Sequence, residues 1–315
     1  MLTDLFGAVL LLIMGFGLLA PLESLRWWTS KGRLSAARTQ RELFDHDELA
    51  PAKDGPFLVY LSGIGVLDGS ANSRKELALL DRLSVELPGA TVLADVFPYS
   101  VENRGLLTGE ARRTRWWTRL RRLRSKMPRL PVYYLINLRN VWQMFVSADH
   151  RYGPAYNYGV ARQIWESLER AGYRRSSGSP VYLIGYSGGG QIALGAAWYL
   201  GMAGVDVSVI SLGGMLSDDP GITRIRHLWH LYGTKDRIQG AGRILFAGRW
   251  PAAPLSGWNR AVKDGRITMI PIPGVIHDGR GDYFETRTSD PTPADQVIGH
   301  IVAAVSGNRA QDSQS

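Results

Sequence analysis

Short apolar runs alternate with longer amphipathic segments along most of this chain. The runs have the length and β-branched content of buried strands, and the segments between them repeat apolar residues at helical spacing. Such an alternation predicts an α/β domain with a mostly parallel sheet. The expected strands are 57–61, 90–96, 181–184, 205–212, 227–232 and 267–272, and the expected helices include 74–87, 131–148, 158–173 and 297–305.

The N-terminus departs from this alternation. Residues 5–22 form an uncharged apolar run of eighteen residues, which is the length a helix needs to cross a bilayer. Trp27 and Trp28 follow where an interfacial aromatic belt would lie, and basic residues continue to Arg41. We therefore expect a single-pass anchor over 1–29 with the body of the protein in the cytoplasm. The alternatives are a cleaved signal peptide, against which Asp4 and the lack of an early basic residue argue, and a buried core helix.

Composition shifts again within a long insertion, 99–157. Ten basic residues and one acidic residue, Glu110, lie between Arg104 and Arg129, within a chain whose net charge is +9. A helix here would carry an apolar stripe that begins at Trp116, and an apolar stripe on a basic helix is typical of a membrane interface. The alternatives are a solvated basic face docked on the core and a nucleic-acid patch. The anchor favours lipid, so we expect no nucleic-acid partner. The expected membrane-surface residues are Trp116, Leu120, Leu123, Arg119, Arg121, Arg122 and Arg124.

The remaining domain boundaries follow from polarity. We expect a polar linker at 30–55, one domain at 56–305, and a disordered tail at 306–315.

The chain has no cysteine, which excludes disulfides and thiolate chemistry. His227 and His230 lie three positions apart on an expected strand, so they point to opposite faces and predict no metal site. We expect no metal and no cofactor.

The first candidate for chemistry lies in 180–200. Gly185-Tyr186-Ser187-Gly188-Gly189 stands between an apolar strand and an Ala- and Leu-rich helix. This is the G-x-S-x-G pattern in the strand-turn-helix context of a nucleophile elbow. Flanking glycines allow strand and helix to pack closely while the serine hydroxyl stands clear of the sheet. The alternative interpretation is a glycine-rich turn with no chemical role.

A second glycine-rich loop, Ser62-Gly63-Ile64-Gly65, follows the first expected strand. In a serine hydrolase such a loop offers a backbone N–H to the tetrahedral oxyanion, with a second from the residue after the nucleophile. The candidates are Gly63 or Ile64, together with Gly188. The rival interpretation is a dinucleotide fingerprint, but the spacing Gly63, Gly65, Gly69 is one residue too long.

An acid and a base follow in the order Ser187, Asp236, His277, each just beyond an expected strand. Asp218 or Asp219 would be the substitute acid, and His46, His150 and His300 have no strand end before them. With YLSGIG, GYSGG, YGTKDRI and PGVIHDG in this order, the chain resembles the α/β-hydrolase superfamily over about 56–305. The resemblance implies an eight-stranded, mostly parallel sheet flanked by helices. It also implies that His277 takes the proton of Ser187 and that Asp236 orients the imidazole.

Together these features predict a membrane-anchored serine hydrolase acting on an acyl ester, thioester or lipid-like substrate. One alternative is a non-catalytic membrane scaffold that keeps the fold and binds lipid or a partner. Another is a nucleotide-dependent reductase that uses the Ser62 loop.

Overall fold

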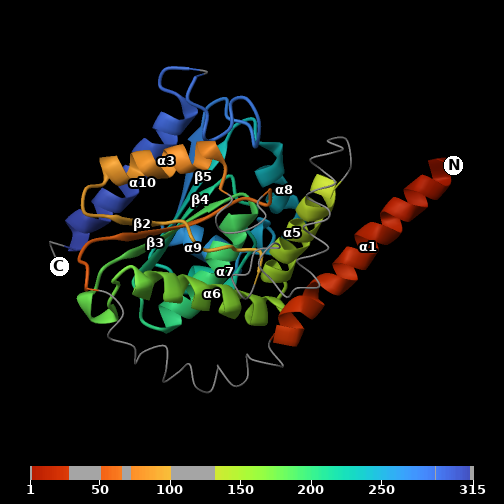
Figure 1. Cartoon of the computed structure of the whole chain (residues 1–315), viewed down its shortest axis with the longest axis horizontal. Helices are drawn as coiled ribbons and strands as arrows, with labels where there is room; N and C mark the ends of the chain where they lie inside the picture. Colours follow the sequence, from red (N-terminus) through yellow and green to blue (C-terminus); the bar gives the residue numbers. More distant parts are fainter. Residues whose placement is uncertain (1, 28–50, 66–71, 101–131, 288, 313–315) are drawn as a thin grey trace.

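One fully parallel sheet of six strands organises the part of the chain that the computed structural model describes, which is residues 2–27, 51–65, 72–100, 132–287 and 289–312 (Figure 1). The strand order is β2-β1-β3-β4-β5-β6, and every neighbouring pair is parallel. The strands are β1 (Phe57–Leu61), β2 (Thr91–Leu93), β3 (Val181–Tyr186), β4 (Val207–Leu212), β5 (Leu228–Gly233) and β6 (Ile267–Ile272).

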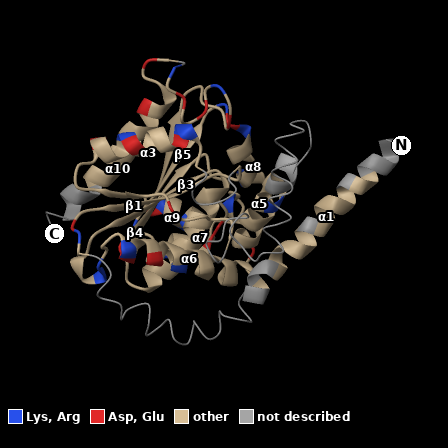
Figure 2. Ribbon diagram, in the orientation of Figure 1, with Lys and Arg blue, Asp and Glu red and all other residues tan. Residues whose placement is uncertain are grey.

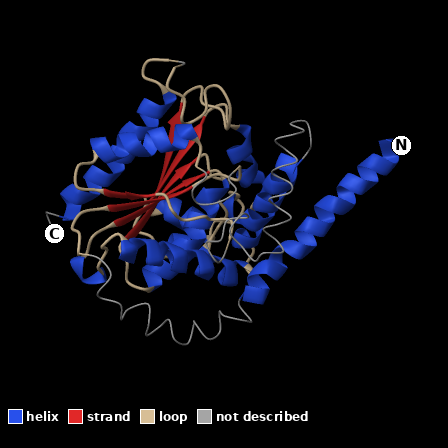
Figure 3. Cartoon of the chain, viewed as in Figure 1, coloured by secondary structure: helices blue, strands red, loops and turns tan. Residues whose placement is uncertain are grey.

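Helices cover both faces of the sheet (Figure 3). Helices α3 and α10 pack on one face, and α6, α7 and α9 pack on the other. The helices are α1 (Leu2–Trp27), α3 (Arg74–Glu86), α5 (Val132–Ala148), α6 (Gly153–Arg170), α7 (Gly188–Met202), α8 (Arg237–Leu245), α9 (Gly257–Lys263) and α10 (Pro293–Asp312), with short 3-10 turns η2 (Arg175–Ser177), η3 (Pro220–Thr223) and η4 (Ala247–Arg249).

Strand β1 shows why the apolar runs are continuous. Its side chains alternate between the two faces, so Phe57, Val59 and Leu61 enter one core while Leu58 and Tyr60 enter the other. All five residues are buried, because helices cover both faces. Full burial of each such side chain contributes roughly 1.5–3 kcal/mol, which explains why this strand is apolar throughout.

The expectation of an α/β fold with a mostly parallel sheet is confirmed, but some of its details are wrong. The described residues form six strands instead of eight. Strand β2 is shorter than expected, because the chain leaves the sheet after Leu93. Helix α10 continues to Asp312, so most of the tail expected to be disordered is helical.

The N-terminal run forms helix α1 and packs in part against α5. Ala20 is buried, and its carbonyl accepts a hydrogen bond from Gln143 Nε2 at 3.4 Å. A Cβ on Gly17 would lie 3.0 Å from the ring of Trp142. Over the described residues, no helix is both long enough and apolar enough to cross a membrane. The expected transmembrane span is therefore not supported.

Two other expected segments lie outside the described residues. They are the polar linker up to residue 50 and the arginine-rich stretch 101–131, which holds all seven expected membrane-surface residues. Helix α5 is the helix that follows this stretch within the expected insertion.

Candidate active site

The carboxyl ends of four strands bring the candidate residues to one edge of the sheet. The chain passes from β1 to β2 on one side and then returns to place β3 on the other side of β1. This reversal is the switch point at which open α/β sheets bind ligands. The loop after β1 carries Gly63 and Ile64, and Ser187 follows β3; Asp236 and His277 follow β5 and β6.

Ser187 occupies a strained turn between β3 and α7. Its φ is 52° and its ψ is −122°, and it is the non-glycine residue with positive φ in the described chain. A Cβ on Gly185 would approach the Gly190 Cα to 2.5 Å, and one on Gly189 would approach the Leu61 carbonyl oxygen to 2.4 Å. Both clashes are with backbone, so glycine is required on each side of the serine. Strain of this kind costs on the order of 1–3 kcal/mol and is concentrated at functional sites.

The Ser187 hydroxyl meets the imidazole of His277. Ser187 Oγ lies 2.8 Å from His277 Nε2, a distance suited to proton transfer. The ring of Tyr186 stacks on the imidazole, with centroids 5.6 Å apart. The Tyr186 hydroxyl also donates to the His277 carbonyl at 2.5 Å. The residue before the nucleophile therefore holds both the ring and the backbone of the candidate base.

Asp236 completes the chain of contacts. Its Oδ2 lies 2.8 Å from His277 Nδ1 and accepts from the Tyr283 hydroxyl at 2.7 Å. Its Oδ1 caps α8 by accepting from the N–H groups of Ile238 and Gln239, at 2.9 and 3.1 Å. Burial alone would raise the pKa of Asp236, but the hydrogen bond and charge of His277 and the other donors outweigh it, and the pKa is lowered. The carboxylate is thus held ionised beside the imidazole.

The other acidic candidates are engaged elsewhere. Asp218 Oδ1 accepts from the Trp258 N–H at 2.5 Å, where it serves the start of α9. Asp219 caps η3 through the Gly221 N–H. The carboxylate that pairs with His277 is that of Asp236. The structure therefore brings Ser187, His277 and Asp236 together and leaves the substitute acids apart.

The candidate oxyanion residues also lie beside one another. A Cβ on Gly188 would lie 2.9 Å from Ile64 Cγ2, and one on Gly63 would lie 3.5 Å from Ser187 Cβ. The loop is held from behind, because Asn140 Nδ2 donates to the Ile64 carbonyl at 2.6 Å. The loop after β1 and the first residue of α7 thus lie close to Ser187, and their role as oxyanion donors stays a prediction.

Three supporting side chains were not predicted from the sequence. Tyr186, Tyr283 and Asn140 contact His277, Asp236 and the Ile64 carbonyl, respectively. Tyr186 could have been suspected from its place inside the G-x-S-x-G pattern. The other two are brought to the site by tertiary packing, and no local pattern marks them.

The two strand histidines have separate partners. His227 Nε2 lies 2.7 Å from Thr268 Oγ1, and His230 Nδ1 lies 3.1 Å from Ser211 Oγ. Burial lowers the pKa of His230 to about 3, so the ring stays neutral. Within the described residues, no group of three histidine, aspartate or glutamate side chains could hold a metal ion.

Comparison with known proteins gives structural likenesses only. No family model and no curated protein matches the chain. Similar solved structures include a dienelactone hydrolase from Anabaena variabilis, with 16% identity, 80% of this chain and 86% of that chain covered, and a TM-score of 0.42. Others are a hyperthermophilic esterase from Pyrobaculum calidifontis, with 12% identity, 82% and 79% coverage and a TM-score of 0.44, and carboxyl esterase 2 from Tuber melanosporum, with 11% identity, 81% and 79% coverage and a TM-score of 0.45. With TM-scores below 0.5, these likenesses carry no inference about the chemistry of this chain.

Proposed function

We propose that this protein is a serine hydrolase of the α/β-hydrolase type that cleaves acyl esters through Ser187, His277 and Asp236. The observation that carries the proposal is the continuous contact Ser187 Oγ to His277 Nε2 and His277 Nδ1 to Asp236 Oδ2, each at 2.8 Å. A hydroxyl, an imidazole and a carboxylate in this order are the arrangement that activates a serine for attack on a carbonyl. The strained backbone at Ser187 supports the same role.

The reaction would proceed through an acyl-enzyme. Ser187 Oγ attacks the ester carbonyl carbon while His277 Nε2 takes the hydroxyl proton, and backbone N–H groups near Gly188 and Ile64 face the developing oxyanion. The intermediate collapses, and the alcohol leaves with the proton from His277. Water then attacks the acyl-serine with His277 again taking the proton, which releases the acid and restores Ser187. Asp236 stays ionised and stabilises the protonated imidazole in each half-reaction.

Fluorophosphonate labelling provides the test. The full chain should gain the mass of one phosphonyl group with loss of fluoride, and the modified residue should be Ser187. Ser187→Ala should abolish the labelling and should lower kcat for a p-nitrophenyl ester by roughly 10⁶, the scale seen when a triad nucleophile is removed. Labelling that persists in Ser187→Ala would overturn the assignment.

The two alternative functions have less support. A non-catalytic scaffold would have no need of a strained serine aligned with an imidazole. A dinucleotide site requires a helix that begins at the glycine-rich loop. Among the described residues, the first helix after this loop is α3, which begins at Arg74, where Ser73 and Glu76 form its capping box. Asp95, the acidic residue after β2, accepts from Ser167 and Arg170 of α6. The geometry therefore favours the hydrolase.

Membrane attachment is a further part of the proposal. Its support is the exposed apolar surface of α1, on which Leu11, Leu18 and Leu19 are 70%, 73% and 62% exposed. Residues 7–22 of this helix include no charged side chain, and Figure 2 accordingly shows no blue or red there. Apolar side chains exposed over so many positions favour a lipid surface, which would supply lipid-like acyl substrates. Flotation of the full chain with vesicles tests attachment, and a reporter fused after Ser315 tests the cytoplasmic location.

A further inference from the structure

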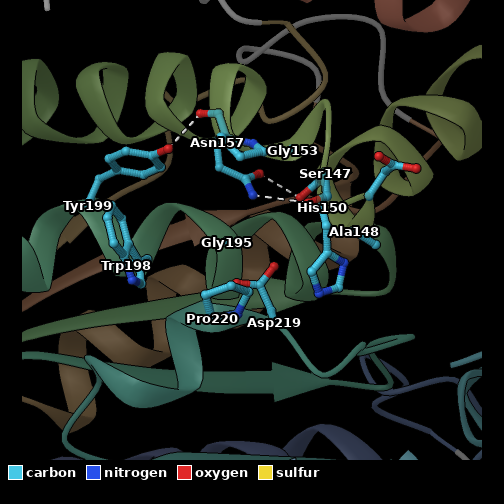
Figure 4. Close-up of a pocket in the computed structure, with 12 residues that line it drawn as sticks. Ser147, Ala148, His150, Gly153, Asn157, Gly195, Trp198, Tyr199, Asp219 and Pro220 are labelled. Carbon is cyan, nitrogen blue, oxygen red and sulfur yellow. Dashed lines mark hydrogen bonds between the residues drawn. The ribbon is translucent and has the colours of Figure 1, made fainter. Parts of the chain in front are cut away.

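A cavity lies between the turn that joins α5 to α6, the middle of α7 and the start of η3, away from the proposed triad (Figure 4). Its volume is about 220 Å³, and most of its wall is apolar, with contributions from Ala148, Pro154 and Trp198. In Figure 4, Trp198 lies toward one end and His150 toward the other, with Asp219 between them. His150 and Pro154 are exposed, so the cavity opens to solvent beside them.

The amide and hydroxyl groups in the cavity wall already have partners. Ser147 Oγ donates to Asn157 Oδ1 at 2.7 Å, and Asn157 Nδ2 donates to the Ser147 carbonyl at 3.0 Å. Tyr199 Oη donates to the Pro154 carbonyl at 2.8 Å. Asp149, the other carboxylate of the wall, pairs with Arg151 at 3.0 Å. These contacts leave the carboxylate of Asp219 and the imidazole of His150 as the groups most able to recognise a ligand.

Asp219 combines burial with uncharged hydrogen-bond donors. Its side chain accepts from Gln191 Nε2 at 3.0 Å and from the Gly221 N–H at 2.8 Å, while the residue is only 5% exposed. Within the described chain, no lysine or arginine forms a salt bridge with it. Burial raises the pKa of Asp219 to about 6, so the group is mostly ionised at neutral pH. A carboxylate has about four acceptor sites, so two donors leave room for a ligand.

We propose that this cavity binds a small organic cation, with an ammonium group on Asp219 and an apolar body of about one ring against Trp198. An ammonium would compensate the buried negative charge, which neutral donors satisfy only in part. The face of an indole also attracts cations and apolar rings. The size is suitable, because a cavity of about 150 Å³ already holds benzene. This site does not depend on the hydrolytic function proposed for Ser187.

The test compares two ligands of almost equal shape, benzylamine as its ammonium ion and neutral benzyl alcohol. Calorimetric titration of the full chain carrying Ser187→Ala, at neutral to mildly alkaline pH, should show benzylammonium binding at least about tenfold more tightly, as expected for a charged hydrogen bond in a partly dry site. Because that variant lacks the proposed nucleophile, the result is independent of whether the protein hydrolyses esters.

Two variants then test whether Asp219 causes the preference for benzylammonium over benzyl alcohol. Asp219→Asn keeps the shape and should reduce the preference for benzylammonium to less than about twofold. Asp206→Asn removes a carboxylate from an exposed ion pair with Arg226 and should leave the preference intact. Absence of binding by both ligands, equal affinities before any change at Asp219, or a preference that survives Asp219→Asn would each overturn the proposal. The ligand comparison alone decides the matter if Asp219→Asn fails to fold.

Discussion

Asp236 and Asp219 are both buried aspartates at the start of a helical turn, yet their surroundings differ in kind. Asp236 has four hydrogen-bond donors, one of which is the imidazole of His277, and its pKa is lowered. Asp219 has two neutral donors, and burial raises its pKa to about 6. The direction in which the pKa of a buried carboxyl group shifts therefore depends on the hydrogen-bond donors around the group as well as on its burial. The first environment suits catalysis, and the second suits the binding of a cation.

Neutralising Asp236 should change activity the most. Asp236→Asn should lower kcat for a p-nitrophenyl ester by about 10⁴, because the amide favours the wrong imidazole tautomer and cannot stabilise the protonated ring. Asp206→Asn, a carboxylate in an exposed ion pair, is the matched control and should retain nearly full activity. Steady-state kinetics on both variants checks this. A loss of less than about tenfold in Asp236→Asn would remove Asp236 from the proposed mechanism.

Adding a methyl group to the elbow around Ser187 and to the wall of the cavity beside Asp219 should each have a medium effect, which is measured on the free energy of unfolding. Gly185→Ala places a Cβ 2.5 Å from the backbone of Gly190, whereas Gly195→Ala places one 2.3 Å from the Asn157 side chain. Backbone in the elbow cannot move away cheaply, so we expect Gly185→Ala to lower the free energy of unfolding by about 3 kcal/mol. Asn157 can turn aside and lose its bonds to Ser147, at a cost of about 1–2 kcal/mol.

Urea unfolding measures both changes, with Gly240→Ala as the control. A Cβ on Gly240, in α8, would meet no side chain and no distant backbone within 4 Å, so alanine there should stabilise the helix by up to about 1 kcal/mol. Equal losses in Gly185→Ala and Gly195→Ala would contradict the view that the elbow is the more constrained of the two regions.

A subtler change concerns the tyrosine that donates to Asp236. Tyr283→Phe removes one donor, so the carboxylate should become more basic and should stabilise protonated His277 more strongly. The acid limb of the kcat/KM profile should therefore move to higher pH, by about half a unit to one unit. The Gly233 N–H, which donates to the same hydroxyl at 2.7 Å, would lose its acceptor, so some loss of stability should accompany the shift.

Tyr182→Phe is the control for this profile. Its hydroxyl makes a long hydrogen bond of 3.5 Å to the Val305 carbonyl of α10. Tyr182 lies near the start of β3, whereas Ser187 follows the end of that strand, so the profile should not move. A profile in Tyr283→Phe that matches this control, or one that moves to lower pH, would show that Tyr283 does not tune Asp236.

The proximity of Ser187, Asp236 and His277 could be predicted from the sequence because each of these residues follows an apolar strand. Parallel strands end at one edge of a sheet, so residues just beyond Tyr186, Gly233 and Ile272 must meet there once the strand order is right. The elbow was readable for a different reason. The backbone contacts of Gly185 and Gly189 leave no room for a side chain, and this requirement is directly visible as a sequence pattern.

The surroundings of α1 could not be predicted in the same way, whereas the apolar runs themselves indicated the six strands that the described residues form and only the family resemblance implied eight. An apolar run of eighteen residues indicates a span when it is considered alone, but α1 also packs Gly17 and Ala20 against α5. Local hydropathy cannot reveal such a contact, because it depends on residues more than a hundred positions away.

Apolar periodicity and the residues next to strand ends were enough to predict the α/β architecture, the buried strands and the order along the chain of the candidate nucleophile, acid and base. Two other features became known only from the folded chain: that Tyr283 and Tyr186 support the contact between His277 and Asp236, and that Asp219 lies in a separate apolar cavity. Hydrogen bonds and the burial of charge depend on neighbours brought together by packing, and residues such as Asp236 and Tyr283 are far apart along the chain.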